Sequence, residues 1–266
     1  MLENLHFTYD GKSSKDFGVV LVNPSGGLYK ETFIPTRKIV ETSVAGRRNP
    51  FFQRVDDDPL SFSFAIYLPE WEERNNLRQI ARWLYQPYYK PLIFESNPDI
   101  VYYAMFIDKS ELTHNGLYEG YISLTVRMNS PYIHSIPHEE NFDINGKETK
   151  VIYNNGDLPM RMKMEIKNKQ INHRVAMTIV ETGEVLLLTN LLPNETVYVD
   201  CINEHITSSL EDTGRYLIDN HNDQWLTIEP ETSARLAINA DASFKITYQY
   251  AYLNLDTELI GRGDNC

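Results

Sequence analysis

Carboxylates are the residues of this chain that come closest to a catalytic arrangement. Asp56-Asp57-Asp58-Pro59 is the densest acidic cluster, and a pair of carboxylates is the minimum that a glycoside hydrolase needs. Three adjacent like charges before a proline are more typical of a solvated loop that leads into a strand. We expect no catalysis at this cluster. A carboxylate pair brought together by the fold, as in a cell-wall hydrolase, stays open as an alternative.

Two further segments resemble metal-binding motifs and lack required ligands. His138-Glu139-Glu140-Asn141-Phe142 begins like a zinc-protease helix, but Phe142 stands where the second histidine belongs. Asp219-Asn220-His221-Asn222-Asp223 begins like a calcium loop, yet Gln224 replaces its glycine and Pro230 its bidentate glutamate. The chain also lacks the nucleophile-elbow, Walker and dinucleotide-binding motifs. We therefore predict no metal, no cofactor and no enzymatic activity.

One segment combines the residue types that dominate protein interfaces. The stretch from Val40 to Val55 contains a glycine turn, two arginines and two adjacent aromatics: Gly46, Arg47, Arg48, Phe51 and Phe52. Aromatic residues and arginine are the usual anchors of an interface. The segment is either a hairpin packed on its own core or a loop that buries its aromatics against another chain, and the sequence allows both.

A second candidate surface lies on a predicted helix. Arg74, Arg78 and Arg82 recur at every fourth residue, so they form one basic ridge along the helix. Like charges at this spacing repel each other unless opposite charges are supplied. The ridge is either a solvated face or a docking face for acidic groups of a neighbouring subunit.

Composition excludes several functional classes. The chain has 266 residues, a net charge of −12 and a predicted pI near 5.0, which argues against general binding to nucleic-acid phosphates. Two cysteines cannot form a disulfide framework, so both are expected to be free thiols. The N-terminus has no signal-peptide pattern and no apolar run is long enough to cross a membrane. A soluble protein made in a cytoplasm is expected.

Hydrophobic periodicity predicts a mainly β protein. Apolar residues alternate with small or polar ones in Leu60–Leu68 and Tyr121–Met128, which is typical of strands with one buried face. Between them, residues 70–85 carry an apolar stripe at helical spacing, formed by Leu77, Ile80, Ala81 and Leu84. The first half is therefore expected to be a β-sandwich or barrel with one flanking α-helix.

The second half reads as an antiparallel β-sandwich. Met160–Ile166 and Phe244–Tyr252 alternate strictly, and turn sequences separate several shorter strand candidates. A polar stretch with prolines around residues 129–140 indicates a domain boundary. We therefore predict two domains, residues 1–134 and 135–266. Dividing the charge there gives 14 − 16 = −2 and 11 − 21 = −10, so most of the acidity is C-terminal.

The order of several short motifs resembles the distal tail protein family of siphophages. The matching pieces run through nearly the whole chain: Asp16-Phe17-Gly18-Val19, Ala45-Gly46-Arg47-Arg48, Ile80-Ala81-Arg82-Trp83-Leu84, Asn155-Gly156-Asp157-Leu158-Pro159 and Trp225-Leu226-Thr227-Ile228-Glu229-Pro230. Each piece is weakly specific by itself, and their order and spacing carry the resemblance.

The resemblance implies a structural role in the virion. An N-terminal domain related to tail-tube proteins would form a hexameric ring, possibly as stacked rings, and a galectin-like C-terminal sandwich would project outward. The ring would join the tail tube protein to tip fibre and receptor-binding proteins, with DNA passing through its lumen and no membrane involved. The oligomer-interface candidates are then Gly46–Phe52 and the arginine ridge.

The main alternative function is a carbohydrate-binding module that attaches to the host cell wall. Sugar-binding galectins use a His, Asn and Arg cluster beside a stacking tryptophan. Trp225 is the one tryptophan of the second half, and His221-Asn222-Asp223 lacks the arginine. This departure favours a galectin-like domain that serves as a scaffold.

Overall fold

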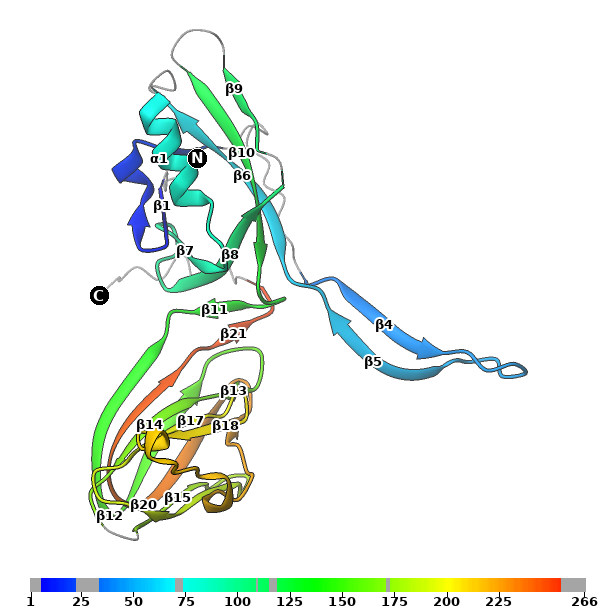
Figure 1. Ribbon diagram of the computed structural model, residues 1–266. Coiled ribbons are helices and arrows are strands. Elements are labelled where there is room, and N and C mark those ends of the chain that lie inside the picture. Colours follow the sequence, from blue (N-terminus) through cyan, green and yellow to red (C-terminus); the bar gives the residue numbers. More distant parts are fainter. Residues whose placement is uncertain are drawn as a thin grey trace, which may run out of the picture. The chain divides into compact units, whose positions relative to one another are not determined.

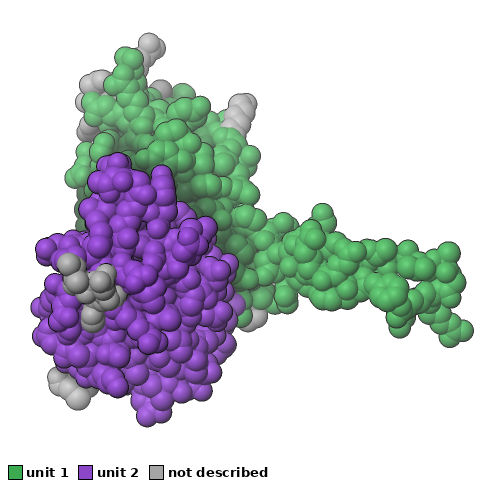
Figure 2. Space-filling model, turned by 60° about the horizontal axis from the view of Figure 1, so that its bottom comes forward, with its two compact units in different colours: residues 1–134, 253–266 green, residues 135–252 purple. Residues whose placement is uncertain are grey.

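The computed structural model describes residues 6–22, 34–69, 74–108, 110–114, 119–170 and 173–254, and the chain divides into two compact units (Figures 1 and 2). Unit 1 comprises residues 1–134 together with 253–266, and unit 2 comprises residues 135–252. The division differs from the predicted second domain, 135–266, because the chain from residue 253 onward groups with unit 1.

Unit 1 is built on an antiparallel sheet with the order β2-β1-β7-β8-β10-β6-β3, and β9 pairs with β10. The predicted alternating segments form its two long neighbouring strands, in which Ile66 lies opposite Ile122. The strands are β1 (Phe7–Tyr9), β2 (Lys12–Ser13), β3 (Val20–Val22), β6 (Ser61–Leu68), β7 (Lys90–Phe94), β8 (Ile100–Ile107), β9 (Leu112–His114) and β10 (Gly120–Met128).

The helix of unit 1 packs through one tryptophan. Helix α1 (Arg74–Leu84) buries Ile80, Trp83 and Leu84, whereas Ala81, expected on the apolar stripe, is exposed. The Trp83 ring stacks on Phe17 at 4.3 Å between centroids. Its Nε1–H donates to the Tyr9 carbonyl at 2.8 Å, so the buried indole is satisfied. The contacts of Trp83 turn the buried face away from Ala81. Residues 70–73, the predicted start of the helix, lie outside the described residues.

A 3₁₀ helix opens this region of unit 1. Helix η1 (Ser14–Phe17) begins with a capping box. The Ser13 side chain accepts a hydrogen bond from the backbone of the helix, and the Asp16 carboxylate accepts one from the Ser13 N–H at 3.2 Å. Gly18 ends it with φ 63°, a left-handed conformation that favours glycine. The Asp16-Phe17-Gly18 motif thus forms a capped turn that presents Phe17 to Trp83.

Unit 2 is organised by two very long strands, β12 (His138–Asn154) and β20 (Thr232–Tyr248), which pair along their whole length. One half of β20 pairs with β14 (Lys163–Asn168) and the other with β15 (His173–Ile179). The long pair therefore belongs to both layers of a sandwich. Gly146 lies opposite Ala240 between the two halves, has φ 92°, and donates its N–H to Asp241 Oδ1 at 2.9 Å.

The remaining strands complete the sandwich of unit 2. The sheet order is β16-β15-β20-β14-β17-β18, with β12 at the other side of β20, and β13 pairs separately with β19. Met162, Met164 and Ile166 are buried, so their predicted alternation is confirmed. The other elements of unit 2 are β13 (Met160–Arg161), β16 (Val185–Leu191), β17 (Thr196–Asp200), β18 (His205–Ser208), η2 (Glu211–Thr213), η3 (Ile218–Asn220) and β19 (Thr227–Ile228). Two short strands, β11 (Ile133–Ser135) and β21 (Ala251–Tyr252), pair with each other outside this sandwich.

The observed architecture confirms the predicted fold class, a mainly β protein with one flanking α-helix in its first part and an antiparallel sandwich in its second. In the described part of the chain, no helix combines the length and apolar character that a membrane crossing requires.

Candidate assembly interface

Two strands of unit 1 form a hairpin of their own. Strands β4 (Arg37–Thr42) and β5 (Phe51–Asp57) pair with each other, and no other described strand extends their sheet (Figure 1). We call the hairpin Arg37–Asp57 the arm. Nearly all of its residues are exposed, in contrast to the alternating burial of β6 and β10. Among the described residues, Phe51 and Phe52 do not pack on the core of the chain, which speaks against the first of the two interpretations of this segment. Burial against another chain stays a prediction.

One face of the arm carries three large apolar side chains. Ile39 lies opposite Val55, and beyond a bulge Glu41 lies opposite Phe52. Residues two apart along a strand share a face, so Ile39 and Glu41 lie on the same face as their partners. We call Ile39, Val55 and Phe52 the apolar stripe; Glu41 lies beside it. Ile39 is 62% exposed and Phe52 is 66% exposed. Large apolar side chains gathered on one exposed face are a mark of an interaction surface.

The tip of the arm has a defined structure. Gly46 has φ 85°, and the Arg47 N–H donates to the Val44 carbonyl at 3.1 Å, which closes the turn. The Arg47 guanidinium lies over the Phe51 ring, 3.6 Å from its centroid. Three of the predicted interface residues are therefore brought together on one side of the tip. Arg48 is exposed beside them, and Phe52 lies on the apolar stripe.

The acidic cluster at the base of the arm is engaged in structural contacts. Arg54 Nε lies 2.8 Å from Asp56 Oδ1, and Arg37 Nε lies 3.0 Å from Asp57 Oδ1. Asp57 also accepts a hydrogen bond of 2.6 Å from the Tyr132 hydroxyl, which is the main cause of a lowered pKa at this carboxylate. These contacts support the interpretation of the cluster as a structural segment.

The arginine ridge lies on the exposed face of α1. Arg78 and Arg82 are exposed, on the side of the helix away from Ile80 and Trp83, and no ion pair reaches either one within the described residues. The side chain of Arg74 lies outside the described part of the structure. The geometry thus presents two accessible cations, and whether they meet another chain stays a prediction.

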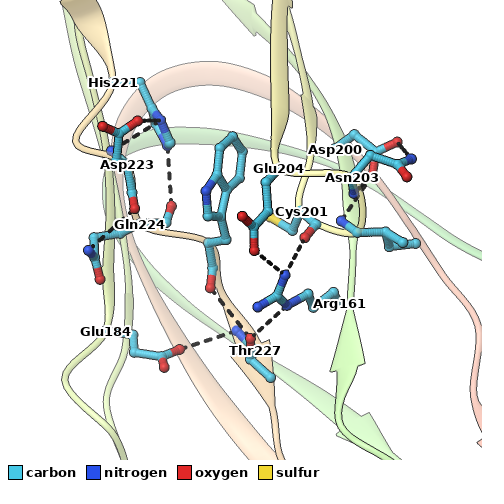
Figure 3. Close-up of polar contacts among 12 residues, drawn as sticks. Arg161, Glu184, Asp200, Cys201, Asn203, Glu204, His221, Asp223, Gln224 and Thr227 are labelled. Atoms are coloured by element: carbon cyan, nitrogen blue, oxygen red, sulfur yellow. Dashed lines mark hydrogen bonds and ion pairs between the residues drawn. The ribbon is translucent and has the colours of Figure 1, made fainter. Parts of the chain in front are cut away.

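Trp225 is the only tryptophan of unit 2, and the residues just before it, His221 to Gln224, form polar contacts with one another (Figure 3). The His221 ring lies 4.5 Å from the Trp225 ring. Its Nδ1 accepts from the Asp223 N–H at 3.2 Å and its Nε2 lies 3.2 Å from the Gln224 carbonyl, which suits a neutral imidazole. Burial lowers the pKa of His221, which also favours the neutral form of the ring. The calcium-like segment is therefore a hydrogen-bonded turn that supports Trp225.

An arginine does reach this region, from a strand that sequence reasoning had not connected with it. Arg161 of β13 donates to Thr227 Oγ1 at 3.2 Å, to the Cys201 carbonyl at 3.2 Å and to Glu204 Oε1 at 2.7 Å (Figure 3). Its guanidinium is thus bound to groups of the protein itself. This network favours the scaffold interpretation of unit 2 over the carbohydrate-binding alternative.

The described residues offer neither a metal-ligand cluster nor a reactive thiol. In those ranges no group of three or more His, Cys, Asp or Glu side chains is arranged to hold a metal. Cys201 is a buried free thiol, and burial raises its pKa to about 11, so it is a poor nucleophile. Cys266 and the Arg262-Gly263-Asp264 tripeptide lie outside the described residues.

Comparisons with known proteins agree with this architecture. The family model described as the phage tail protein N-terminal domain matches residues 2–130. The SPbeta prophage-derived uncharacterized protein YomH of Bacillus subtilis (strain 168) is 29% identical over 253 residues, which cover 94% of this chain and 99% of that protein. The first part of the chain is thus similar to a phage tail protein domain, and nearly the whole chain is similar to a prophage-derived protein.

Solved structures give the fold of the whole chain. The crystal structure of SPP1 Dit (gp 19.1), described as a paradigm of the hub adsorption apparatus in phages that infect Gram-positive bacteria, aligns with a TM-score of 0.67 at 12% identity and covers 94% of this chain and 99% of that one. A chain of the phage P2 baseplate, in its activated conformation with calcium, aligns with a TM-score of 0.50 at 9% identity, covering 91% of this chain and 97% of that one. The fold matches that of SPP1 Dit, and together with the family-model match this confirms the resemblance predicted from the sequence.

Proposed function

We propose that this protein is a structural, non-enzymatic hub at the distal end of a long phage tail. Six copies would form a ring that joins the tail tube protein to the tip fibre and receptor-binding proteins and leaves a central channel for DNA. The family and the fold supply the role, and the arm carries the case for self-assembly. Synthesis in the host cytoplasm stays a prediction.

The arm is the observation on which self-assembly rests. An isolated two-stranded hairpin is at best marginally stable in water, yet the arm exposes Ile39 and Phe52 on one face and Phe51 on the other. Full burial of one such side chain contributes about 1.5–3 kcal/mol. Docking on a second copy would bury these side chains. If the same contact is repeated around a closed ring, the arm of every copy is buried on its neighbour.

Charge distribution is compatible with unit 1 as the ring-forming part. Unit 1, residues 1–134 and 253–266, carries 15 − 19 = −4, whereas unit 2, residues 135–252, carries 10 − 18 = −8, so copies of unit 1 repel each other less than copies of unit 2. On this proposal unit 2 lies outside the ring and offers docking sites to other tail proteins. The exposed Arg78 and Arg82 would meet carboxylates of an adjacent subunit.

The mass of the purified protein tests the proposal. We expect light scattering to give a hexamer or a multiple of it, and negative-stain micrographs to show rings. Replacing Val40–Arg54 by Asn-Gly, which joins Ile39 to Val55 through a two-residue turn, should leave a folded monomer. A wild-type chain that stays monomeric at high concentration, alone and with the tail tube and tip proteins of the same phage, would overturn the hub proposal.

A pair of point variants isolates the apolar stripe. Ile39→Ser should shift assembly to at least tenfold higher protein concentration, since it removes an apolar contact from the interface. Ile218→Ser is the matched control, because Ile218 is 78% exposed on unit 2 and lies outside the arm. Equal effects of the two variants would show that the stripe has no special part in assembly.

A further inference from the structure

A three-residue hydrogen-bonded group closes the base of the arm. Asp57 is the last residue of β5, and each of its carboxylate oxygens accepts a hydrogen bond. Arg37 Nε donates to one oxygen at 3.0 Å, and the Tyr132 hydroxyl donates to the other at 2.6 Å. Arg37 is the first residue of β4. We call Arg37, Asp57 and Tyr132 the latch. It joins both strands of the arm to a residue that is far away in sequence.

Tyr132 lies in the segment between β10 and β11, and the backbone of this segment is held by unit 1. The Leu60 N–H donates to the Ser130 carbonyl at 3.2 Å, and the Met128 N–H donates to the Leu60 carbonyl at 2.8 Å. The Tyr132 N–H donates to Ser130 Oγ at 3.0 Å. Tyr132 is therefore a fixed point next to the residues, from 135 onward, that form unit 2.

The neighbouring aspartate provides a contrast. Among the described residues, the Asp56 carboxylate contacts Arg54 of the same strand, at 2.8 Å. Consecutive residues of a strand point to opposite faces, so the side chains of Asp56 and Asp57 diverge. The Asp57 side chain ties the arm to the rest of unit 1, whereas the Asp56 side chain ties the arm to itself.

The protonation states of the latch suit a lasting contact. The hydrogen bond from Tyr132 lowers the pKa of Asp57, and the same bond raises the pKa of Tyr132. At neutral pH the phenol is therefore a donor and the carboxylate a charged acceptor, which is the stronger type of hydrogen bond.

We propose that Asp57 is the positioning residue of the arm: through Tyr132 it sets the direction in which the arm leaves the rest of unit 1. The importance of this direction rests on the proposed ring, since an arm with a loosely held base would present its apolar stripe over a range of angles. The positioning itself is a property of the single chain.

Distance measurements between spin labels test the positioning. Exposed Ser43 on the arm and Ser123 on β10 are replaced by cysteine in a Cys266→Ser background, and the buried Cys201 is kept. Tyr132→Phe, which removes only the hydroxyl, should at least double the width of the Ser43–Ser123 distance distribution. Asp57→Asn should broaden it too, and Asp56→Asn is the matched control that should not. Equal widths in wild type, Tyr132→Phe and Asp57→Asn would overturn the proposal.

Urea unfolding separates positioning from a general effect on stability. A merely structural role of the Tyr132 hydroxyl would lower the urea midpoint of Tyr132→Phe without changing the width of the Ser43–Ser123 distance distribution in the folded protein.

These measurements remain separable from the ring proposal. The distance measurements are made on the Ile39→Ser variant at low concentration, where the protein is expected to be monomeric. Ring formation by the unlabelled Tyr132→Phe variant is then measured by light scattering, and assembly should need at least fivefold more protein. If Tyr132→Phe forms rings at the same concentration as the wild type, the proposed role of Asp57 in positioning the arm for assembly is wrong, and the hub proposal is unaffected. If the wild-type protein forms no rings, the hub proposal is wrong. The widths of the distance distributions then still test whether the latch orders the arm.

Discussion

The guanidinium of Arg47 lies 3.6 Å from the centroid of the Phe51 ring, at the tip of a hairpin that no other described strand supports. The contact is formed across the turn that Gly46 makes possible with φ 85°. A cation over an aromatic face orders both side chains before any partner arrives, which lowers the entropy lost on binding. The tip of the arm is thus ordered before it contacts another chain, which would favour assembly of the proposed ring.

The first prediction concerns this cation–π pair. Arg47→Ala should weaken association of the copies by about 0.5–1 kcal/mol, because an exposed cation–π contact has that magnitude. This corresponds to a roughly two- to fivefold higher concentration for half-assembly, measured by analytical ultracentrifugation. Lys147→Ala removes an exposed cation from unit 2 and should leave assembly unchanged. An Arg47→Ala variant that assembles like the wild type would contradict a role for the tip.

The second prediction concerns the arginine ridge of α1. Arg78→Glu should weaken assembly at least tenfold if the ridge meets carboxylates of an adjacent subunit, because it replaces attraction with like-charge repulsion. The urea midpoint should stay the same, since Arg78 is exposed. Gln79→Glu places a negative charge on the next exposed residue of the helix and serves as the control. Unchanged assembly of Arg78→Glu would identify the ridge as a solvated face.

The third prediction concerns the core of unit 1. Trp83 is 2% exposed, stacks on Phe17 and donates to the Tyr9 carbonyl. Trp83→Ala should lower the free energy of unfolding of unit 1 by about 3–5 kcal/mol, because it leaves a large cavity. Trp83→Phe keeps an aromatic ring and loses the donor, so the loss should be smaller, about 1–3 kcal/mol. Urea unfolding measured by far-UV circular dichroism distinguishes the three proteins, and equal stability of Trp83→Ala and wild type would contradict the packing described here.

The fourth prediction concerns a buried carboxylate of unit 2. The Glu195 side chain is 0% exposed and lies 2.5 Å from Arg215 Nε. Ser208 Oγ also donates to it, at 2.6 Å, and the Leu192 N–H donates at 2.7 Å. Glu195→Ala should cost unit 2 about 3–5 kcal/mol, because it leaves the Arg215 charge without its partner. Asp212→Asn, an exposed change on the nearby η2, should stay within about 0.5 kcal/mol.

The same carboxylate predicts how acid affects unit 2. Burial opposes ionisation of Glu195, but hydrogen bonds from Arg215, Leu192 and Ser208 outweigh it and lower the pKa. The unfolded chain therefore binds a proton more readily than the native state, at a pKa of about 4.3. The stabilisation is present above that pH and is lost as the pH falls through the lower folded pKa. Unfolding free energies measured between about pH 5 and 2 should fall less steeply in Glu195→Gln than in wild type, and equal slopes would contradict this assignment.

The alternating segments were predictable because periodicity is a local property. Residues of β10 alternate between core and surface as their sequence pattern indicates, with Ile66 opposite Ile122. In β6 the pattern holds except at Ala65, which is buried where β3 pairs with this strand. The stripe of α1 was predicted with one error, Ala81, because Trp83 competes for the buried side through its stacking on Phe17. A helical stripe indicates which residues are apolar, and the partner surface decides which of them are covered.

The sequence by itself determined the β-rich architecture, the position of the helix, the uneven charge of the two halves and the family resemblance, since each of these is written in residue types and their spacing. Tertiary structure decided whether Phe51 and Phe52 are buried, because burial depends on whether another strand borders the hairpin. It also joined Asp57 to Tyr132, which are 75 positions apart, and brought Arg161 to Thr227, 66 positions away. Contacts of this kind have no local signal, because a side chain at one end of the pair can meet its partner only after the strands between them have folded.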